Sequence, residues 1–327
     1  MGTRSPMRNE RKKMTDSRIT SAVADSLIAR QLNAWPHARA NYRALENVEV
    51  KEFNIGGMPV KVQFNPARAV SSGAKVDAAS LAARPCFLCA ANRPAEQESI
   101  DIDGRYELLV NPFPIFPRHL TIPANTHTEQ LISGRIADMM RMALELDTYT
   151  IFYNGPRCGA SAPDHMHFQG GNSDFLTLAS AIEASDLSFL QSDSGASLSL
   201  STSLPVRCFI IDAHCPEAGA AMFERLYSAM PLAEGEKEPM MNILCQTKGK
   251  GQTRTIVVPR RRHRPSCYGT EGESCIMLSP ASVDMGGVFI TPRRTDFDKI
   301  TPDILLGILD EVCLDRNSIE TIAKNIK

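Results

Sequence analysis

The stretch GASAPDHMHFQGG, from Gly159 to Gly171, places His165 and His167 two positions apart, with Gln169 two positions further on. Side chains of a β-strand alternate between its two faces, so this spacing predicts that all three project to one side, about 6.5–7 Å apart. The apolar residues between them would then enter a core on the other side. We therefore expect one strand to present two imidazoles and an amide to a common site.

Small residues lead into this motif in the segment NGPRCGAS, residues 154–161. Such residues allow backbone amides to approach a phosphate group closely, while Ser161 can add a hydroxyl and Arg157 a positive charge. The sequence therefore predicts substrate contacts from Asn154, Arg157, Gly159 and Ala160. Two alternatives are a hairpin whose histidines are merely satisfied polar groups, and a metal site that uses one of the two histidines.

Two cysteines in the segment RPCFLCAANRP, Cys86 and Cys89, have the C-x-x-C spacing of a zinc site. They could also be two buried thiols or a redox pair, although the βαβ context of a thioredoxin-like motif is absent. Tetrahedral zinc needs two further ligands. His165 is one candidate, and the other is His119 or His127, of which we favour His127 because it follows a strand at the start of an expected helix. The sequence thus predicts a structural zinc ion.

The composition indicates a globular protein without a strong overall charge. The chain has 327 residues, of which 43% are hydrophobic and 22% charged, and its formal net charge is −1. We therefore expect neither a nucleic-acid partner nor a membrane partner. The basic first residues lack the apolar segment of a secretory signal, and nine cysteines favour a reducing compartment, so we expect a cytoplasmic protein.

Hydrophobic periodicity predicts an α+β chain of two related halves. Within the first half, it predicts amphipathic helices over 19–45 and 126–149, and a hairpin of strands joined by a Gly-Gly turn over 48–64. The expected organisation is a disordered segment over 1–17, a domain over 18–185 that carries the histidine motif, a Ser-rich loop or linker over 186–205, and a second half over 206–327.

The order of these features resembles the histidine-triad superfamily, and most closely its nucleotidyltransferase branch. That branch contains the galactose-1-phosphate uridylyltransferases, the diadenosine tetraphosphate phosphorylases and the GDP-L-galactose phosphorylases. The segment NGPRCGASAPDHMHFQ is similar to the phosphorylase motif, and CFLC with His127 and His165 resembles the zinc site of the uridylyltransferases. Met166 stands where the uridylyltransferases have proline. The resemblance implies a histidine-triad-like (HIT-like) fold of mainly antiparallel sheets with flanking helices.

The resemblance also implies that His167 attacks the α-phosphorus of a nucleotide and forms a covalent nucleotidyl-histidine, assisted by Gln169 and Ser161. The donor would be a nucleotide sugar or a dinucleoside polyphosphate, and the acceptor phosphate or a sugar phosphate. An amide such as Gln169 has no proton to exchange at neutral pH, which favours transfer over activation of water. The alternatives are a nucleotide hydrolase of the same superfamily and a non-catalytic nucleotide-binding protein. Family members often pair through the sheet, so a homodimer is also expected as one state.

Basic residues elsewhere supply further candidate phosphate contacts. Arg68 and Lys75 follow the N-terminal hairpin together with Asn65, while Lys248 and Arg254 belong to a basic run in the second half. We expect them to bind the nucleotide or a second phosphate, and the alternative for each is a solvated surface. The chain has neither a P-loop nor G-x-G-x-x-G after a strand, so neither a kinase nor a Rossmann enzyme is indicated.

Overall fold

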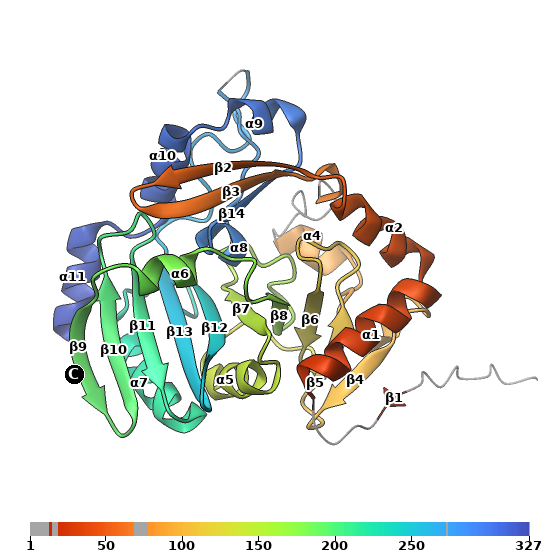
Figure 1. Ribbon diagram of the computed structural model, residues 1–327, viewed down its shortest axis with the longest axis horizontal. Helices are drawn as coiled ribbons and strands as arrows, with labels where there is room; N and C mark the ends of the chain where they lie inside the picture. Colours follow the sequence, from red (N-terminus) through yellow and green to blue (C-terminus); the bar gives the residue numbers. More distant parts are fainter. Residues whose placement is uncertain (1–12, 15–18, 69–77, 273, 327) are drawn as a thin grey trace, which may run out of the picture.

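One large sheet runs through both halves of the chain (Figure 1). The computed structural model describes residues 13–14, 19–68, 78–272 and 274–326. Within them this sheet has 11 strands, and every pair is antiparallel except β1 with β4. In spatial order the strands are β1 (Lys13–Met14), β4 (Ser99–Ile102), β5 (Tyr106–Val110), β6 (His119–Pro123), β8 (His167–Asn172), β7 (Tyr149–Asn154), β12 (Met241–Gly249), β13 (Gln252–Pro259), β11 (Cys208–Ala213), β10 (Ala196–Ser201) and β9 (Ser188–Asp193).

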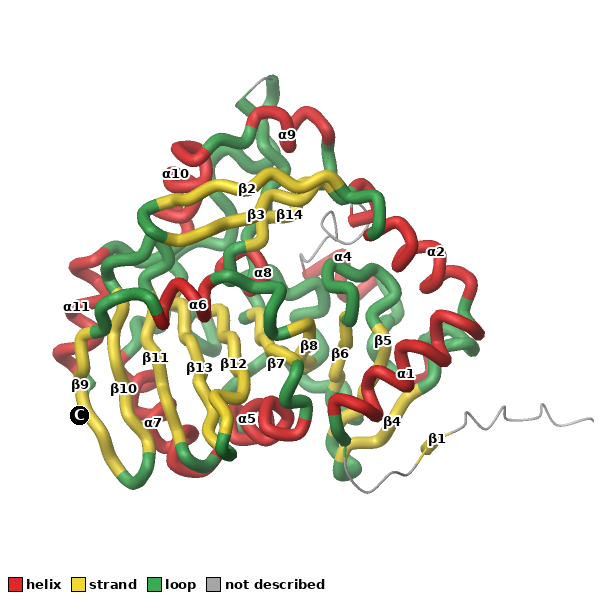
Figure 2. The backbone as a smooth tube through the Cα atoms, viewed as in Figure 1, coloured by secondary structure: helices red, strands yellow, loops and turns green. Residues whose placement is uncertain are grey.

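A second, smaller sheet also contains strands from both halves of the chain. Its antiparallel hairpin, β2 (Glu49–Ile55) and β3 (Met58–Phe64), turns at Gly56 and Gly57, as predicted. The third strand, β14 (Val288–Thr291), comes from the second half and pairs with β3 in parallel. Figure 2 shows this small sheet lying across the upper ends of the large sheet's central strands in that view.

Helices cover both layers of the fold. Helices α5 and α7 pack against the large sheet, α11 packs on α7, and α9 and α10 pack against the small sheet. The helices of the described residues are α1 (Ser21–Ala34), α2 (Pro36–Leu45), α4 (Ala78–Ala83), α5 (Ile136–Glu145), α6 (Leu178–Glu183), α7 (Pro216–Ala229), α8 (Ser282–Met285), α9 (Arg294–Lys299), α10 (Pro302–Val312) and α11 (Arg316–Asn325). The predicted α+β class, with mainly antiparallel sheets and flanking helices, is therefore confirmed.

The two halves meet at the centre of the large sheet, where β7 of the first half pairs with β12 of the second. The register sets Asn154 at the end of β7 opposite Asn242 near the start of β12. Met166 and Phe168 pack into a large apolar core, as their alternation with the histidines predicts. A second core fills the space between the large and small sheets and contains residues of both halves, such as Phe152 and Phe289.

Two predicted helices are shorter than the sequence pattern suggests. The segment 19–45 divides into α1 and α2 because Trp35 adopts an extended conformation before Pro36, where a helical residue would clash with the proline ring. In the segment 126–149 only Ile136–Glu145 is helical. The preceding residues instead use their backbone groups on neighbouring segments, for example when the Met166 amide donates to the Thr128 carbonyl.

The Ser-rich segment is a hairpin rather than the predicted loop or linker. Strands β9 and β10 form one edge of the large sheet, and Gly195, with φ +91°, lies in the turn between them. In β10 the serines alternate with Leu198 and Leu200, which enter the core. That alternation has the period of two that a half-buried strand requires, so the segment forms a strand despite its high serine content.

The N-terminal prediction is tested at two residues only. Lys13–Met14 pair with Ser99 and Ile100, whereas 1–12 and 15–18 of the segment expected to be disordered lie outside the described residues. Among the residues that the structure describes, no helix combines the length and the apolar character needed to cross a bilayer.

Candidate active site

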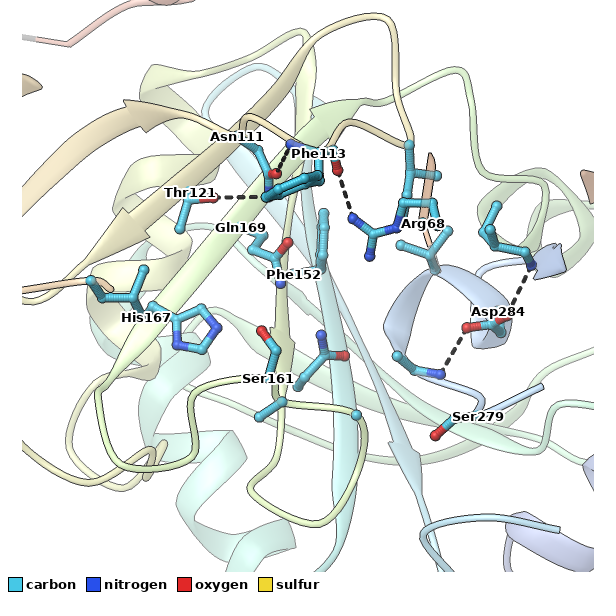
Figure 3. A pocket seen from close by; sticks show the side chains of 18 of the residues that line it. Arg68, Asn111, Phe113, Thr121, Phe152, Ser161, His167, Gln169, Ser279 and Asp284 are labelled. Atoms are coloured by element: carbon cyan, nitrogen blue, oxygen red, sulfur yellow. Dashed lines mark hydrogen bonds between the residues drawn. The ribbon is translucent and has the colours of Figure 1, made fainter. Parts of the chain in front are cut away.

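A cavity of about 440 Å³ opens beside the ends of β7 and β8, at the junction of the two halves (Figure 3). Its walls include His167 and Gln169 from β8, the loop 159–161, and side chains from the segment 263–290 of the second half. Apolar side chains of the first half, among them Phe113 and Phe152, line another part of it. The cavity therefore combines an apolar surface with polar groups from several elements, which is typical of a small-molecule site.

His167 presents a neutral imidazole to this cavity. Its Nδ1 lies 2.8 Å from the backbone carbonyl oxygen of His165, which can only accept a hydrogen bond, so Nδ1 must carry the proton. The Nε2 atom is then unprotonated and keeps its lone pair. Burial lowers the pKa of His167 to about 4. The ring is therefore neutral at pH 7 and has a nucleophilic nitrogen available.

Gln169 is oriented by a buried histidine behind it. The Ile115 amide donates to Nδ1 of His119 at 3.1 Å, which assigns the ring proton to Nε2. That Nε2 lies 3.1 Å from Oε1 of Gln169, so the amide oxygen accepts from His119 and the NH₂ group is left to face the cavity. Burial, followed by the charge of Arg68, lowers the pKa of His119 to about 3, which keeps this arrangement neutral.

Asn154 is fixed in the same way. Its Oδ1 accepts from Nδ2 of Asn242 at 3.0 Å and from the backbone amide of Ser282 at 2.8 Å. Both donors belong to the second half of the chain. Asn154 lines the cavity, and its NH₂ group remains available to donate hydrogen bonds to a ligand there. Asn154 and Gln169 thus both contribute donors and not acceptors, which suits a ligand with phosphoryl oxygens.

The loop before the histidine motif is tightly packed on the second half. Gly159 has φ +96°, and a Cβ at this position would lie 2.5 Å from Cβ of Ala281. Ala160 and Ser161 line the cavity, and the Ser161 carbonyl accepts from Nη2 of Arg84 at 3.1 Å. The small residues of this loop are therefore needed for packing as well as for access by a ligand.

The opposite wall of the cavity carries charge. Arg68 donates to the Phe113 carbonyl at 2.6 Å, and Nε of Arg264 donates to the Ser279 hydroxyl at 3.1 Å. Asp284 accepts from the Ala281 amide at 2.8 Å, and burial raises the pKa of its carboxyl to about 6. Figure 3 shows Asp284, Ser279 and Arg68 on the side of the cavity away from His167.

The four predicted metal ligands form one cluster next to the cavity. The ligand atoms of Cys86, Cys89, His127 and His165 all lie within 4.8 Å of one another. Sγ of Cys86 is 3.3 Å from Nδ1 of His165, and Sγ of Cys89 is 3.2 Å from Nδ1 of His127. His119 lies elsewhere, behind Gln169, so the structure selects His127 from the two candidates.

The cluster fits a tetrahedral thiolate–imidazole site. Two sulfurs and two nitrogens are a donor set that suits Zn²⁺. His165 bonds through Nε2 to the Ala124 carbonyl at 2.8 Å, which places the proton on Nε2 and leaves Nδ1 free to bind a metal. Nε2 of His127 lies 3.8 Å from a carboxylate oxygen of Asp164, a second polar group behind a ligand.

Comparison with known proteins identifies the fold. Residues 182–327 match the family model described as GDPGP1-like, C-terminal domain, and residues 27–172 match a domain of unknown function, DUF4922. No curated protein sequence matches the chain.

Solved structures of yeast Ap4A phosphorylase Apa2 resemble most of the chain. The complex with AMP has a TM-score of 0.64 at 18% identity, covering 92% of this chain and 98% of Apa2. The complex with Ap4A has a TM-score of 0.58 at 18% identity, covering 86% of this chain and 97% of Apa2. The chain has a histidine-triad-like fold. The predicted resemblance to the nucleotidyltransferase branch of that superfamily is confirmed.

Within this histidine-triad-like fold, the polar residues of the histidine motif are divided between two sites. Strand β8 begins at His167, whereas His165 lies in a turn before it, with its amide donating to the Ala162 carbonyl. The prediction that all three polar side chains share one strand face is therefore wrong for His165. Its ring belongs to the Cys/His cluster, while His167 and Gln169 line the cavity.

Several predicted substrate contacts lie away from the cavity. Arg157 points to a different depression and pairs with Glu236. Lys248 and Arg254 both bind Asp212, at 2.7 and 2.8 Å. Since Asn242 is the residue opposite Asn154, Lys248 lies about 20 Å further along β12. Asn65 is buried beside β14 and is not among the cavity-lining residues, and Lys75 lies outside the described residues.

Sequence reasoning missed several residues of the site. Arg264 and His263 belong to the same basic run as Arg254, only ten residues further on, but hairpin β12–β13 ends between them. Asp284 reaches the cavity from helix α8, and Gln130 comes from the loop that was predicted to be helical. The sequence signal for Arg264 is a basic residue in a predicted loop, and the neighbouring arginines of the same run share that signal.

Proposed function

We propose that this protein is a nucleotidyltransferase or phosphorylase that works through a covalent nucleotidyl-histidine on His167. The observation that carries the proposal is the Nδ1–H of His167 held by the His165 carbonyl, which leaves Nε2 as a neutral nucleophile at the cavity. In the proposed step, the lone pair of Nε2 forms a bond to the α-phosphorus, and the bond from that phosphorus to the bridging oxygen breaks. The leaving group departs as a sugar phosphate anion from a nucleotide sugar, or as a nucleoside polyphosphate anion from a dinucleoside polyphosphate.

The donor set of the cavity supports a phosphoryl ligand. The NH₂ groups of Gln169 and Asn154 can donate to oxygens that gain negative charge in the transition state, and Ser161 offers a hydroxyl. Arg68 and Arg264 add positive charge on the opposite wall. Yeast Apa2, which has this fold, was solved with Ap4A and with AMP, which supports a nucleotide as the ligand class.

The second substrate in this proposal is an anion, either inorganic phosphate or a sugar phosphate. Gln169 cannot take a proton from water, because its oxygen is already bonded to His119 and its nitrogen has no lone pair to offer. An anionic acceptor needs no such base. The proposed donor is a nucleotide sugar or a dinucleoside polyphosphate, and transfer is favoured over hydrolysis. We further propose a cytoplasmic location, which nine free thiols support.

We also propose that Cys86, Cys89, His127 and His165 hold a structural zinc ion. Such an ion would cross-link three chain segments beside the cavity, including the peptide whose carbonyl orients His167. Metal analysis of the purified protein tests this, with one zinc per chain expected. The Cys86→Ser variant should lose the metal, whereas Cys215→Ser, which removes an exposed thiol outside the cluster, should keep it. A Cys86→Ser protein with full zinc content would contradict the ligand set.

The covalent mechanism is tested by labelling. The protein is incubated with α-³²P-labelled nucleotide sugars and dinucleoside polyphosphates of several bases, and an acid-labile adduct on the protein is measured. We expect an adduct with at least one donor, and a decrease of at least about 10³-fold in the His167→Ala variant. The matched control is His214→Ala, which removes an exposed histidine that bonds Gln252.

The outcomes separate the candidate activities. Absence of any adduct with folded protein would contradict the covalent mechanism, and labelling of His167→Ala would contradict the assigned nucleophile. Discharge of the adduct by phosphate but not by hexose phosphate would identify a phosphorylase. Discharge by water at the same rate would identify a hydrolase.

A further inference from the structure

The pairing between β7 and β8 stops just before the two site residues at their ends. The ladder runs from Tyr149 opposite Asn172 to Phe152 opposite Gln169. Continued at the same register, it would place Asn154 opposite His167. On its other side, His167 faces Pro123, which has no amide hydrogen to donate. The backbone groups of His167 and Asn154 therefore need a partner from outside the sheet.

The side chain of Gln130 is that partner. Its Nε2 donates to the carbonyl of Asn154 at 3.0 Å and to the carbonyl of His167 at 3.0 Å. Its Oε1 accepts from the backbone amide of His167 at 2.7 Å. A side-chain carboxamide offers the N–H and C=O of a peptide together with one further N–H, so Gln130 acts as an inserted peptide unit between the two strand ends and bonds both carbonyls. Gln130 is fully buried, and it lines no part of the cavity.

Gln130 is itself held from two directions. Its amide donates to the Pro163 carbonyl at 3.1 Å, and its carbonyl lies 3.1 Å from the hydroxyl of Tyr153. The same hydroxyl is 2.6 Å from Oε1 of Glu238. These contacts come from β7 and from the loop that leads into β8, so the backbone of Gln130 is held on both sides of the gap that its side chain bridges.

The inserted carboxamide widens the gap between the strands at the site. Directly paired residues of an antiparallel ladder have Cα atoms about 4.5–5.5 Å apart, which would bring Asn154 and His167 together. With Gln130 between them, their backbones are bridged by a side chain instead, and both side chains line the cavity. The amide and carbonyl of His167 are then both bonded to one group, which restricts the orientation of its ring.

We propose that Gln130 is a positioning residue that sets the separation and orientation of His167 and Asn154. The proposal rests on the nucleophilic role proposed above for His167. Gln130 touches no ligand in it, and its effect on the reaction passes through the two strand ends. A displacement of about 1 Å at a reacting group can lower a rate by about 10²-fold, so we expect the chemical step to be sensitive to this residue.

The test compares the variants Gln130→Leu and Gln130→Glu with the wild-type protein. Gln130→Glu has the same shape and keeps an acceptor for the His167 amide, but it places an oxygen against two carbonyls. We expect both variants to lower the single-turnover rate of adduct formation by about 10²-fold, with less than about fivefold weaker nucleotide binding. The control is Leu198→Ala, a core truncation in the distant strand β10, which should lower thermal stability without this split between rate and affinity.

A second measurement does not depend on activity. In ¹⁵N-histidine NMR spectra, wild-type His167 should be the single Nδ1–H tautomer, and in Gln130→Leu or Gln130→Glu it should show both tautomers. If the wild-type protein forms no adduct, the covalent mechanism fails, and the NMR comparison still decides the role of Gln130. Variants that are folded, with an unchanged His167 signal and an unchanged adduct rate where one is measured, would overturn the proposal.

Discussion

His119 donates its Nε2–H to Oε1 of Gln169 across 3.1 Å, and this bond decides which end of the Gln169 amide faces the cavity. The opposite end of the same ring is fixed by the Ile115 amide, so the histidine cannot reverse its donor and acceptor roles without breaking a bond. His119 is fully buried and does not itself line the cavity, whereas the two hydrogen-bond partners of its ring, Gln169 and Ile115, do.

We expect His119→Phe to lower the rate of adduct formation about tenfold. Phenylalanine fills similar space but offers no proton, so Gln169 can turn its oxygen toward the phosphoryl group and repel it. The effect should be smaller than that of Gln169→Ala, which removes the donor altogether. Single-turnover labelling of the three proteins measures both effects. Equal rates for His119→Phe and wild type would show that Gln169 is oriented without this bond.

In an Asp284→Asn variant, which lacks the cavity carboxyl whose pKa is raised to about 6, the rate of adduct formation should be nearly independent of pH between 5.5 and 8. The pKa of His167, lowered to about 4 by burial, leaves the ring unprotonated over this whole range. A histidine with its ordinary pKa of about 6.5 would be unprotonated to only about a tenth at pH 5.5. The measurement is the labelling rate at half-unit pH steps with a nucleotide sugar, which has no ionisation in this range. A midpoint near 6.5 would show that His167 is solvated.

Gly159→Ala should lower the free energy of unfolding by about 1–3 kcal/mol and should slow adduct formation. The new methyl group would strain the backbone at φ +96° and would overlap Ala281. The control is Gly57→Ala, where φ is +84° and no atom lies within 4 Å of the new Cβ, so only the backbone term remains. In the double variant Gly159→Ala with Ala281→Gly, we expect part of the loss to be recovered. Denaturant unfolding of the wild type, the single variants Gly159→Ala and Ala281→Gly, and the double variant gives the coupling between the two positions.

Replacing Glu238 by glutamine should change how stability depends on pH. Burial raises the pKa of Glu238 from 4.5 to about 7, so the folded protein binds this proton more tightly than the unfolded chain does. Its stabilising contribution is then complete below about pH 4.5 and is lost as the pH rises through about 7, by an amount of the order of 3 kcal/mol. Glu238→Gln cannot lose a proton and should gain in Tm relative to wild type between pH 5 and 8. The exposed Glu129→Gln is the control, and a pH-independent difference for Glu238→Gln would contradict the shift.

The sequence could predict those parts of the site that depend on local spacing. The motif around His167 and Gln169 and the pair Cys86 and Cys89 lie on short segments whose geometry follows from a few residues. Lys248 and Arg254 were misassigned because their partner, Asp212, lies on a neighbouring strand that is distant in sequence. A basic residue carries no local signal that tells a structural ion pair from a phosphate contact.

Other features could not be predicted because they arise from pairing between distant segments. Arg264 and Asp284 meet the motif only after the two halves join along β7 and β12. Gln130 lies in the segment 126–149 that the sequence pattern predicts to be helical, whereas its side chain bonds the strand ends where the β7–β8 ladder stops. In the Ser-rich segment the alternation of serine with leucine has the period of a half-buried strand, although the composition is typical of a loop.

The parallel pairing of β3 with β14 has a consequence for how the protein is made. Strand β3 can pair with β14 only after Val288, the partner of Lys61, has been synthesised. Asp284, which lines the cavity, belongs to the same late segment of the chain. In a chain emerging from the ribosome, His167 and the Cys/His cluster are therefore synthesised well before the residues that complete the cavity. Native contacts between segments so far apart form late because the intervening chain must first be ordered. Measuring chaperone binding to nascent chains that end before residue 288 would test whether the incomplete site is shielded from solvent during synthesis.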